Sequence, residues 1–200
     1  EGETTLEVET DYPWNGRVRV VVVFVPGGRW SLALRVPHWA DDASVRVNDE
    51  QLSAAVADGW LHSERDWKPG DEVVLELLLE PRFTRADPRV DADRGLVAVE
   101  RGPLVYCIEA VDHPGQRLDD LVIDPHSAPE LAGPVAQLGP VAALTLRATR
   151  RSRSQDSWWP YAAISSTSES SAGSTTLTAV PYYTWGNRGE GPMRVWLRAE

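Results

Sequence analysis

The feature that most constrains the fold of this chain is a period-two alternation of apolar and polar residues, which recurs in short runs along most of its length. In residues 30–36, for example, Leu32, Leu34 and Val36 would all lie on one side of an extended strand. No window of helical length carries a convincing apolar stripe with a period of 3.6 residues. The sequence therefore predicts β-strands rather than helices.

Turn residues divide the chain into many short strands. Asn15-Gly16 and Pro26-Gly27-Gly28 are typical of turns, and the residues between them read as one strand. The expected strands are residues 6–9, 17–25, 30–36, 44–48, 60–64, 72–79, 96–99, 104–108, 142–147, 175–183 and 193–197. Strands that recur roughly every 8–12 residues are typical of a sandwich or barrel. We therefore expect an all-β fold of two consecutive antiparallel β-sandwich (jelly-roll-like) domains.

The boundary between the two domains is expected near residues 86–95, where turn residues interrupt the pattern at 86–88 and 91–95. We therefore assign residues 1–90 to the first domain and residues 91–200 to the second. Two segments of the second domain are expected to be irregular. Residues 112–140 hold five prolines, too many for a central strand or a helix, and residues 165–176 form a polar loop rich in Ser and Thr.

Charge and hydropathy exclude two classes of partner. The net charge is −10, and residues 1–100 carry 20 acids against 11 bases. Such a surface repels a phosphate backbone, so we expect no nucleic-acid partner. The longest apolar run, residues 20–25, is too short to cross a bilayer, and we expect no membrane partner. No basic-then-apolar signal segment opens the chain, whose first residues read as the interior of a longer protein; its location is left open, with the cytoplasm favoured.

The cysteine and histidine content argues against a metal site. The one cysteine, Cys107, excludes an internal disulfide and a thiolate-rich zinc site. It lies in the middle of an apolar strand, where a free cysteine is usually a small buried hydrophobic residue, so we do not expect a nucleophile. The four histidines show no ligand spacing: His38, His62, His113 and His126. We therefore expect no metal and no cofactor in this chain.

A series of short motifs follows in order along the chain. Residues 100–109 read ERGPLVYCIE, residues 181–189 read PYYTWGNRG, and residues 193–196 read MRVW. Earlier segments are LALRVPHW at 32–39 and RDWKPGD at 65–71, and Asp49 follows Val47-Asn48 where a glycine is usual. In this order, the motifs resemble those of glycoside hydrolase family 127, the β-L-arabinofuranosidase family, in the β-sandwich region that follows its catalytic barrel.

The resemblance implies a parent enzyme whose chemistry lies elsewhere. Enzymes of the family are retaining glycosidases on an (α/α)6 barrel, with a proposed cysteine nucleophile, a carboxylate acid/base and a zinc ion held by cysteines and a glutamate. The nucleophile belongs to a Cys-Cys pair upstream of the sandwich region, and no such pair occurs here. The chain is therefore expected to be a non-catalytic C-terminal portion that stabilises or packs against the barrel and is inactive alone.

Charged residues that could carry glycosidase chemistry have simpler interpretations. That chemistry needs two carboxyl groups about 5–10 Å apart, and the pairs Glu64/Asp66 and Asp71/Glu72 fall at strand edges and turns, where solvated surface is expected. Glu109 ends an apolar strand, and we interpret it as a buried or interface partner. Arg188 is expected to have a structural role. No catalytic residue is assigned.

The nine tryptophans leave an alternative function, a carbohydrate-binding module. Five of them lie in or beside expected strands and are interpreted as core or corner residues: Trp14, Trp30, Trp60, Trp67 and Trp196. Trp158, Trp159 and Tyr161 fall in a polar loop whose burial no period dictates, and their ring faces are the candidate sugar platform. Packing against the barrel, or closure of the loop, is the interpretation we favour for them.

Overall fold

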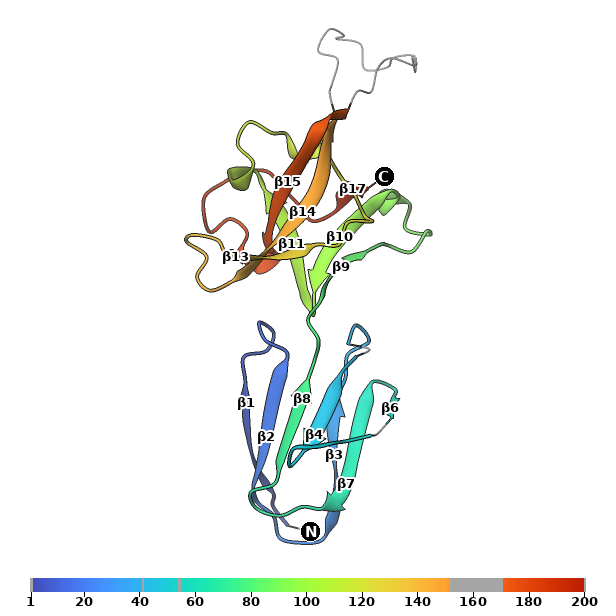
Figure 1. Cartoon of the computed structure of the whole chain (residues 1–200), viewed down its shortest axis with the longest axis vertical. Coiled ribbons are helices and arrows are strands. Elements are labelled where there is room, and N and C mark those ends of the chain that lie inside the picture. Colours follow the sequence, from blue (N-terminus) through green and yellow to red (C-terminus); the bar gives the residue numbers. More distant parts are fainter. Residues whose placement is uncertain (1, 41, 54, 152–170, 200) are drawn as a thin grey trace. The chain divides into compact units, whose positions relative to one another are not determined.

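The computed structural model describes residues 2–40, 42–53, 55–151 and 171–199, and it confirms the all-β fold (Figure 1). The chain divides into two compact units, residues 1–80 and residues 81–200. Helical structure in the described residues is limited to four short 3₁₀ turns: η1 (Asp91–Asp93), η2 (Ala110–Asp112), η3 (Leu118–Asp120) and η4 (Tyr182–Thr184). Within these described segments, no helix has the length and apolar character needed to span a membrane.

Unit 1, residues 1–80, is a sandwich of a five-stranded and a three-stranded antiparallel sheet. The larger sheet contains, in spatial order, β1 (Thr5–Thr10), β2 (Arg17–Phe24), β8 (Glu72–Glu76), β4 (Ser44–Val47) and β5 (Glu50–Gln51). The smaller sheet contains β3 (Arg29–Arg35), β7 (Trp60–Asp66) and β6 (Val56–Ala57).

The core of unit 1 follows from the alternation in the sequence. Val20 and Val22 of β2 are buried, whereas Arg19, which precedes Val20 in the strand, contacts carboxylates on the opposite face. From the smaller sheet, Leu34 of β3 and Leu61 of β7 are direct cross-strand neighbours and join the same apolar cluster. Period-two patterning therefore places one face of each sheet in the core.

Unit 2, residues 81–200, is built on one large sheet. Its strands, in spatial order, are β16 (Met193–Arg194), β11 (Leu104–Glu109), β15 (Ser171–Pro181), β14 (Ala142–Arg151), β12 (Leu121–Ile123), β17 (Leu197–Ala199), β10 (Leu96–Arg101) and β9 (Pro81–Thr84), and β13 (Glu130–Pro134) also pairs with β14. Because β10 also pairs with β11, six strands form a closed circuit of pairings. The pairs are antiparallel except β12–β17, which is parallel.

Over residues 106–109 both faces of β11 are buried, which explains the unbroken apolar run at 106–108. Tyr106 and Ile108 enter the main core with residues such as Leu144 and Leu177. Cys107 points to the other side and packs in a second cluster. The partly buried residues around that cluster are Ala132, Val135, Leu138, Met193 and Val195.

The division between the units falls ten residues before the expected boundary at 90/91. Strand β9 belongs to unit 2 because it pairs with β10, with Val99 opposite Phe83. The turn residues at 86–95 therefore connect two strands of one sheet. A turn inside a hairpin and a turn between domains carry the same local signals, so the sequence did not distinguish them.

The two segments expected to be irregular are only partly so. Within residues 112–140, β12 is buried beside β14 and β17, and β13 pairs with β14. Pro134 is the last residue of β13, and the other four prolines fall outside both strands, so the sheet tolerates them. In the expected loop at 165–176, residues 171–176 belong to β15, while residues 165–170 lie outside the described residues. Pairing with β14 overrides their polar composition.

Candidate functional site

The three residues predicted to form a sugar platform cannot be placed. Trp158, Trp159 and Tyr161 lie outside the described residues. Of the other tryptophans, Trp67 is buried and donates from Nε1 to the carbonyl oxygen of Trp30 at 3.1 Å. Trp14 and Trp60 are exposed, so two of the five expected core or corner tryptophans lie at the surface.

Cys107 has the environment of a structural residue. It is free, and only 1% of its surface is exposed. Burial, followed by the nearby negative charge of Glu109, raises the pKa of its thiol to about 12. The reactive thiolate is therefore scarce at neutral pH. The prediction that Cys107 is buried is therefore confirmed, and its low reactivity stays a prediction.

Three of the four carboxylates considered for glycosidase chemistry, those of Glu64, Asp71 and Glu72, are bound to other groups. Glu64 is exposed and lies 3.2 Å from Arg29, and Asp71 accepts hydrogen bonds from Asn48 and from the backbone of Lys68, both at 2.8 Å. The hydrogen-bonded guanidinium of Arg19 lowers the pKa of Glu72. Among the described residues, no group of three His, Cys, Asp or Glu side chains could hold a metal ion.

The strongest candidate site is a turn in unit 2, residues 181–189, which we call the aromatic turn. It presents Tyr182, Tyr183 and Trp185 to solvent, with 46–51% of each residue exposed. The rings of Tyr182 and Trp185 are nearly parallel, 7° apart, with centroids separated by 6.1 Å. That separation lies near the long end of the range of about 4.5–7 Å for offset aromatic pairs, so the two rings overlap little.

Short-range hydrogen bonds define the backbone of the aromatic turn. The Thr184 hydroxyl donates to the carbonyl oxygen of Pro181 at 2.7 Å, and the Trp185 amide donates to that of Tyr182 at 3.0 Å. Thr184 itself is buried, so it anchors the turn while its neighbours face outward. The polar residue in the middle of an aromatic run is thus the one that points inward.

A buried ion cluster stabilises the backbone of the aromatic turn. Arg188 lies 2.6 Å from a carboxylate oxygen of Glu109 and 2.6 Å from both oxygens of Asp112. The side chains of Arg188 and Glu109 are each only 5% exposed. The other oxygen of Glu109 accepts from the Gly186 amide at 3.1 Å, which ties the cluster to the turn. Hydrogen bonds to the two carboxylates raise the pKa of Arg188, so its charge is permanent.

His113 extends this cluster into the sheet. The Thr178 amide of β15 donates to Nε2 at 3.1 Å, so Nδ1 carries the proton. Nδ1 then donates to the carbonyl oxygen of Glu109 at 2.7 Å. His113 is buried, and these two bonds give the neutral imidazole a structural role.

The aromatic turn suits binding rather than proton transfer. Its large exposed side chains are aromatic, and the carboxylates beneath it, those of Glu109 and Asp112, are bound to Arg188. The sequence predicted structural roles for Glu109 and Arg188. The motif PYYTWGNRG was noted there, but its aromatic residues were not predicted to form a site. The repeated aromatics beside small and polar residues were the available signal. Their exposure depends on partners more than 70 residues away.

Comparison with known proteins places both units. Residues 81–198 match the profile of the glycoside hydrolase family 127 C-terminal domain, and residues 1–79 match that of the β-L-arabinofuranosidase GH127 middle domain. The chain is 36% identical, over 203 residues, to the non-reducing end β-L-arabinofuranosidase of Bifidobacterium longum subsp. longum, with 97% of this chain and 30% of that protein covered.

Solved structures agree. A GH127 β-L-arabinofuranosidase of Geobacillus stearothermophilus T6 gives a TM-score of 0.85 at 33% identity, covering 98% of this chain and 31% of that one. The GH127 β-arabinofuranosidase BT3674 gives a TM-score of 0.83 at 31% identity, covering 98% of this chain and 32% of that one. The chain thus spans about a third of the length of these relatives.

Proposed function

Because the chain belongs to glycoside hydrolase family 127 and matches its middle and C-terminal domains, we propose that it is the non-catalytic β-sandwich portion of a longer β-L-arabinofuranosidase-like enzyme. In this proposal it stabilises, or packs against, the catalytic (α/α)6 barrel of that enzyme. The observation that carries it is the state of Cys107. The one thiol of the chain is buried, with its pKa raised to about 12, so it does not suit nucleophilic attack.

The proposal extends to the cofactor. A zinc site of the family's kind needs several cysteines and a glutamate, and the residues of this chain do not fit that requirement. Cys107 is buried in an apolar cluster, and the two carboxylates whose charges act on its thiol, Glu109 and Asp112, are bound to Arg188. Any zinc of the parent enzyme is therefore expected to lie outside this chain.

An activity assay tests the leading function. The purified chain should not hydrolyse an aryl β-L-arabinofuranoside, and Cys107→Ser should give the same result. Hydrolysis that Cys107→Ser abolishes would overturn the proposal. Circular dichroism of both proteins, which should show the same β-sheet spectrum, controls for folding.

A second candidate function is carbohydrate binding, and the aromatic turn favours it. Exposed, well-ordered aromatic faces bind the apolar CH faces of sugars, and Tyr182, Tyr183 and Trp185 provide such faces on a braced backbone. Trp158, Trp159 and Tyr161 remain the platform proposed from the sequence.

Glycan titration separates these alternatives. An arabinan and glycoprotein-glycan panel should show binding that Trp185→Ala weakens if the aromatic turn is used. Trp158→Ala or Trp159→Ala should weaken it if the sequence-predicted platform is used. Trp60→Ala, an exposed tryptophan of unit 1, is the matched control. Absence of binding across the panel would exclude this second function.

A further inference from the structure

Unit 1 has an apolar surface that its own smaller sheet does not cover. The larger sheet has five strands and the smaller sheet three. Strand β1 forms one edge of the larger sheet and lies on the side away from β3, β7 and β6 (Figure 1). All six residues of β1 are exposed, whereas β2 beside it contains buried valines. The apolar face of the larger sheet therefore extends one strand beyond its cover.

Strand register shows which side chains form this surface. Leu6 is paired with Val22, and Val8 with Val20. Directly paired residues of an antiparallel sheet point to the same face, so Leu6 and Val8 point to the core side. Val22 and Val20 are 0% and 6% exposed, but Leu6 and Val8 are 36% and 57% exposed. We call Leu6 and Val8 the β1 overhang.

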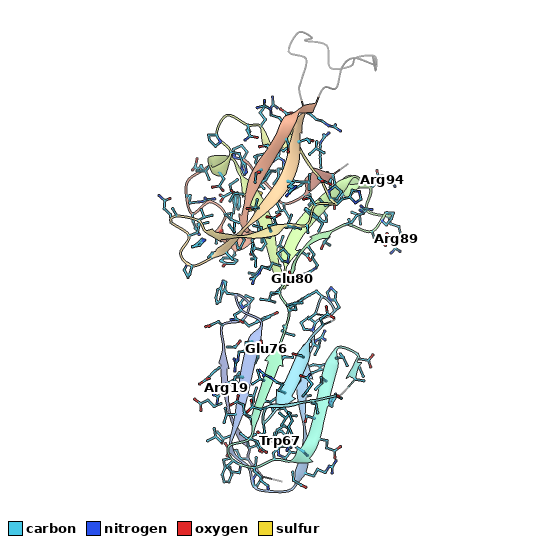
Figure 2. The ribbon with its side chains drawn as sticks, viewed as in Figure 1. Arg19, Trp67, Glu76, Glu80, Arg89 and Arg94 are labelled. Carbon is cyan, nitrogen blue, oxygen red and sulfur yellow. The ribbon has the colours of Figure 1, made fainter. Side chains whose placement is uncertain are left out.

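The opposite face of β1 has a different chemistry. Arg19, which is labelled in Figure 2, contacts Glu9 at 2.9 Å and Glu72 at 2.6 Å. An ion-pair ladder therefore crosses β1, β2 and β8. Glu7 lies on this same outer face, paired with Val21. The strand thus has a charged face that suits water and an apolar face that does not. A strand with water on both sides would not require this apolar face.

We propose that the β1 overhang is the contact surface for the polypeptide that precedes the middle domain in the parent enzyme. This inference rests on the proposed function and names the surface through which it acts. The matched relatives are about three times longer than this chain, and unit 1 matches the domain described as the middle one. The uncovered residues lie on the first strand of that domain, next to the junction with whatever precedes it.

Charge adds a requirement on the partner surface. Between residues 2 and 11 the chain has four acids and no base: Glu3, Glu7, Glu9 and Asp11. Glu7 and Glu9 lie on the face away from the overhang, whereas Glu3 and Asp11 flank the strand at its two ends. The surface that covers Leu6 and Val8 should therefore be apolar at its centre and basic only at its rim, beside Glu3 and Asp11. The free edge of β1, which pairs only with β2 among the described strands, lies in the same contact area.

Cysteine footprinting on the parent enzyme tests this inference, because alternate residues of β1 serve as matched controls. The variants are Leu6→Cys and Val8→Cys on the overhang, and Glu7→Cys and Glu9→Cys on the charged face. Each is reacted with a neutral maleimide, and the modified peptides are quantified by mass spectrometry. Positions 6 and 8 should react at least about tenfold more slowly than 7 and 9, because a covered thiol reacts only after local opening. In the 200-residue chain alone, all four should react at similar rates.

The outcomes separate this inference from the function on which it rests. The melting temperature of the catalytic part is measured with and without residues 1–200. If this chain raises that temperature but positions 6 and 8 react as fast as 7 and 9, the inference that the β1 overhang is the contact surface is wrong, and the proposed function stands. If the temperature does not change and no position is protected, both fail. Protection that appears in the isolated chain and grows with its concentration would identify a second copy as the partner and overturn the inference.

Discussion

Arg188 illustrates how one buried side chain fixes the shape of a surface turn. A buried guanidinium is costly unless carboxylates and hydrogen bonds surround it, and here Glu109 and Asp112 provide both. The sequence indicated a structural role for Arg188. It did not indicate the partners, since Glu109 and Asp112 are 79 and 76 residues away.

Removing Arg188 should destabilise unit 2. We expect Arg188→Ala to lower the free energy of unfolding by about 3–5 kcal/mol, because two carboxylates would be left without their cation. Arg188→Lys should also destabilise, since an ammonium group lacks the planar fork that bridges two carboxylates. Chemical denaturation measures both. The control is Arg194→Ala, whose pair with Asp119 is exposed and should contribute less than about 1 kcal/mol; equal losses for Arg188→Ala and Arg194→Ala would contradict the brace.

Cys107 gives a prediction about pH. The folded thiol has a pKa raised to about 12 from an ordinary value of about 9. Above pH 9 the unfolded chain loses this proton while the folded chain keeps it, so the unfolded state is favoured as pH rises. The free energy of unfolding should fall, relative to Cys107→Ala, by up to about 1.4 kcal/mol per pH unit between about pH 9 and pH 12. Denaturation curves at several pH values provide the test, and parallel pH profiles for the two proteins would show that burial does not raise this pKa.

At the scale of elements, local patterning identified the long strands and missed the short ones. Alternation over residues 30–36 gave β3 almost to the residue, because one face is buried and the other is solvated. The two-residue strands β5 and β6 carry no period of their own and form only by pairing with the edge of a neighbouring strand. The single strand expected at residues 193–197 is divided between β16 and β17. Strand β12 was not predicted because prolines precede and follow it, although none lies within it.

Strand β9 provides a test of the boundary between the units. Phe83 packs against the main core of unit 2, and Arg82 pairs with Glu100 at 2.5 Å. A fragment of residues 91–200 loses both, so it should be less stable than residues 81–200 by about 2–4 kcal/mol, the usual cost of removing a packed large side chain. Thermal or urea unfolding of the two fragments makes the comparison. Equal stability would place β9 outside the cooperative unit.

At the scale of the whole molecule, the acidic charge belongs to one unit. Unit 1 carries 16 acids and 7 bases, and unit 2 carries 14 and 13. Salt screens the repulsion among the excess acidic residues of unit 1, which should stabilise this unit. Salt also weakens the exposed ion pairs, but each of these contributes little to stability. Raising NaCl from about 10 mM to about 0.5 M should therefore slow hydrogen exchange in β8 of unit 1 more than in β14 of unit 2. Mass spectrometry resolves the two strands, and an equal response would argue against charge repulsion in unit 1.

The sequence by itself determined the all-β class, the family and the burial of Cys107, because period-two patterning, ordered motifs and an apolar strand are local properties. Only the tertiary structure decided where the units divide, which aromatic residues are exposed, and what Arg188 binds. These depend on pairings between residues far apart in the chain. The same holds for β1: its alternation predicted a strand with one apolar face, but only the smaller size of the facing sheet leaves that face uncovered.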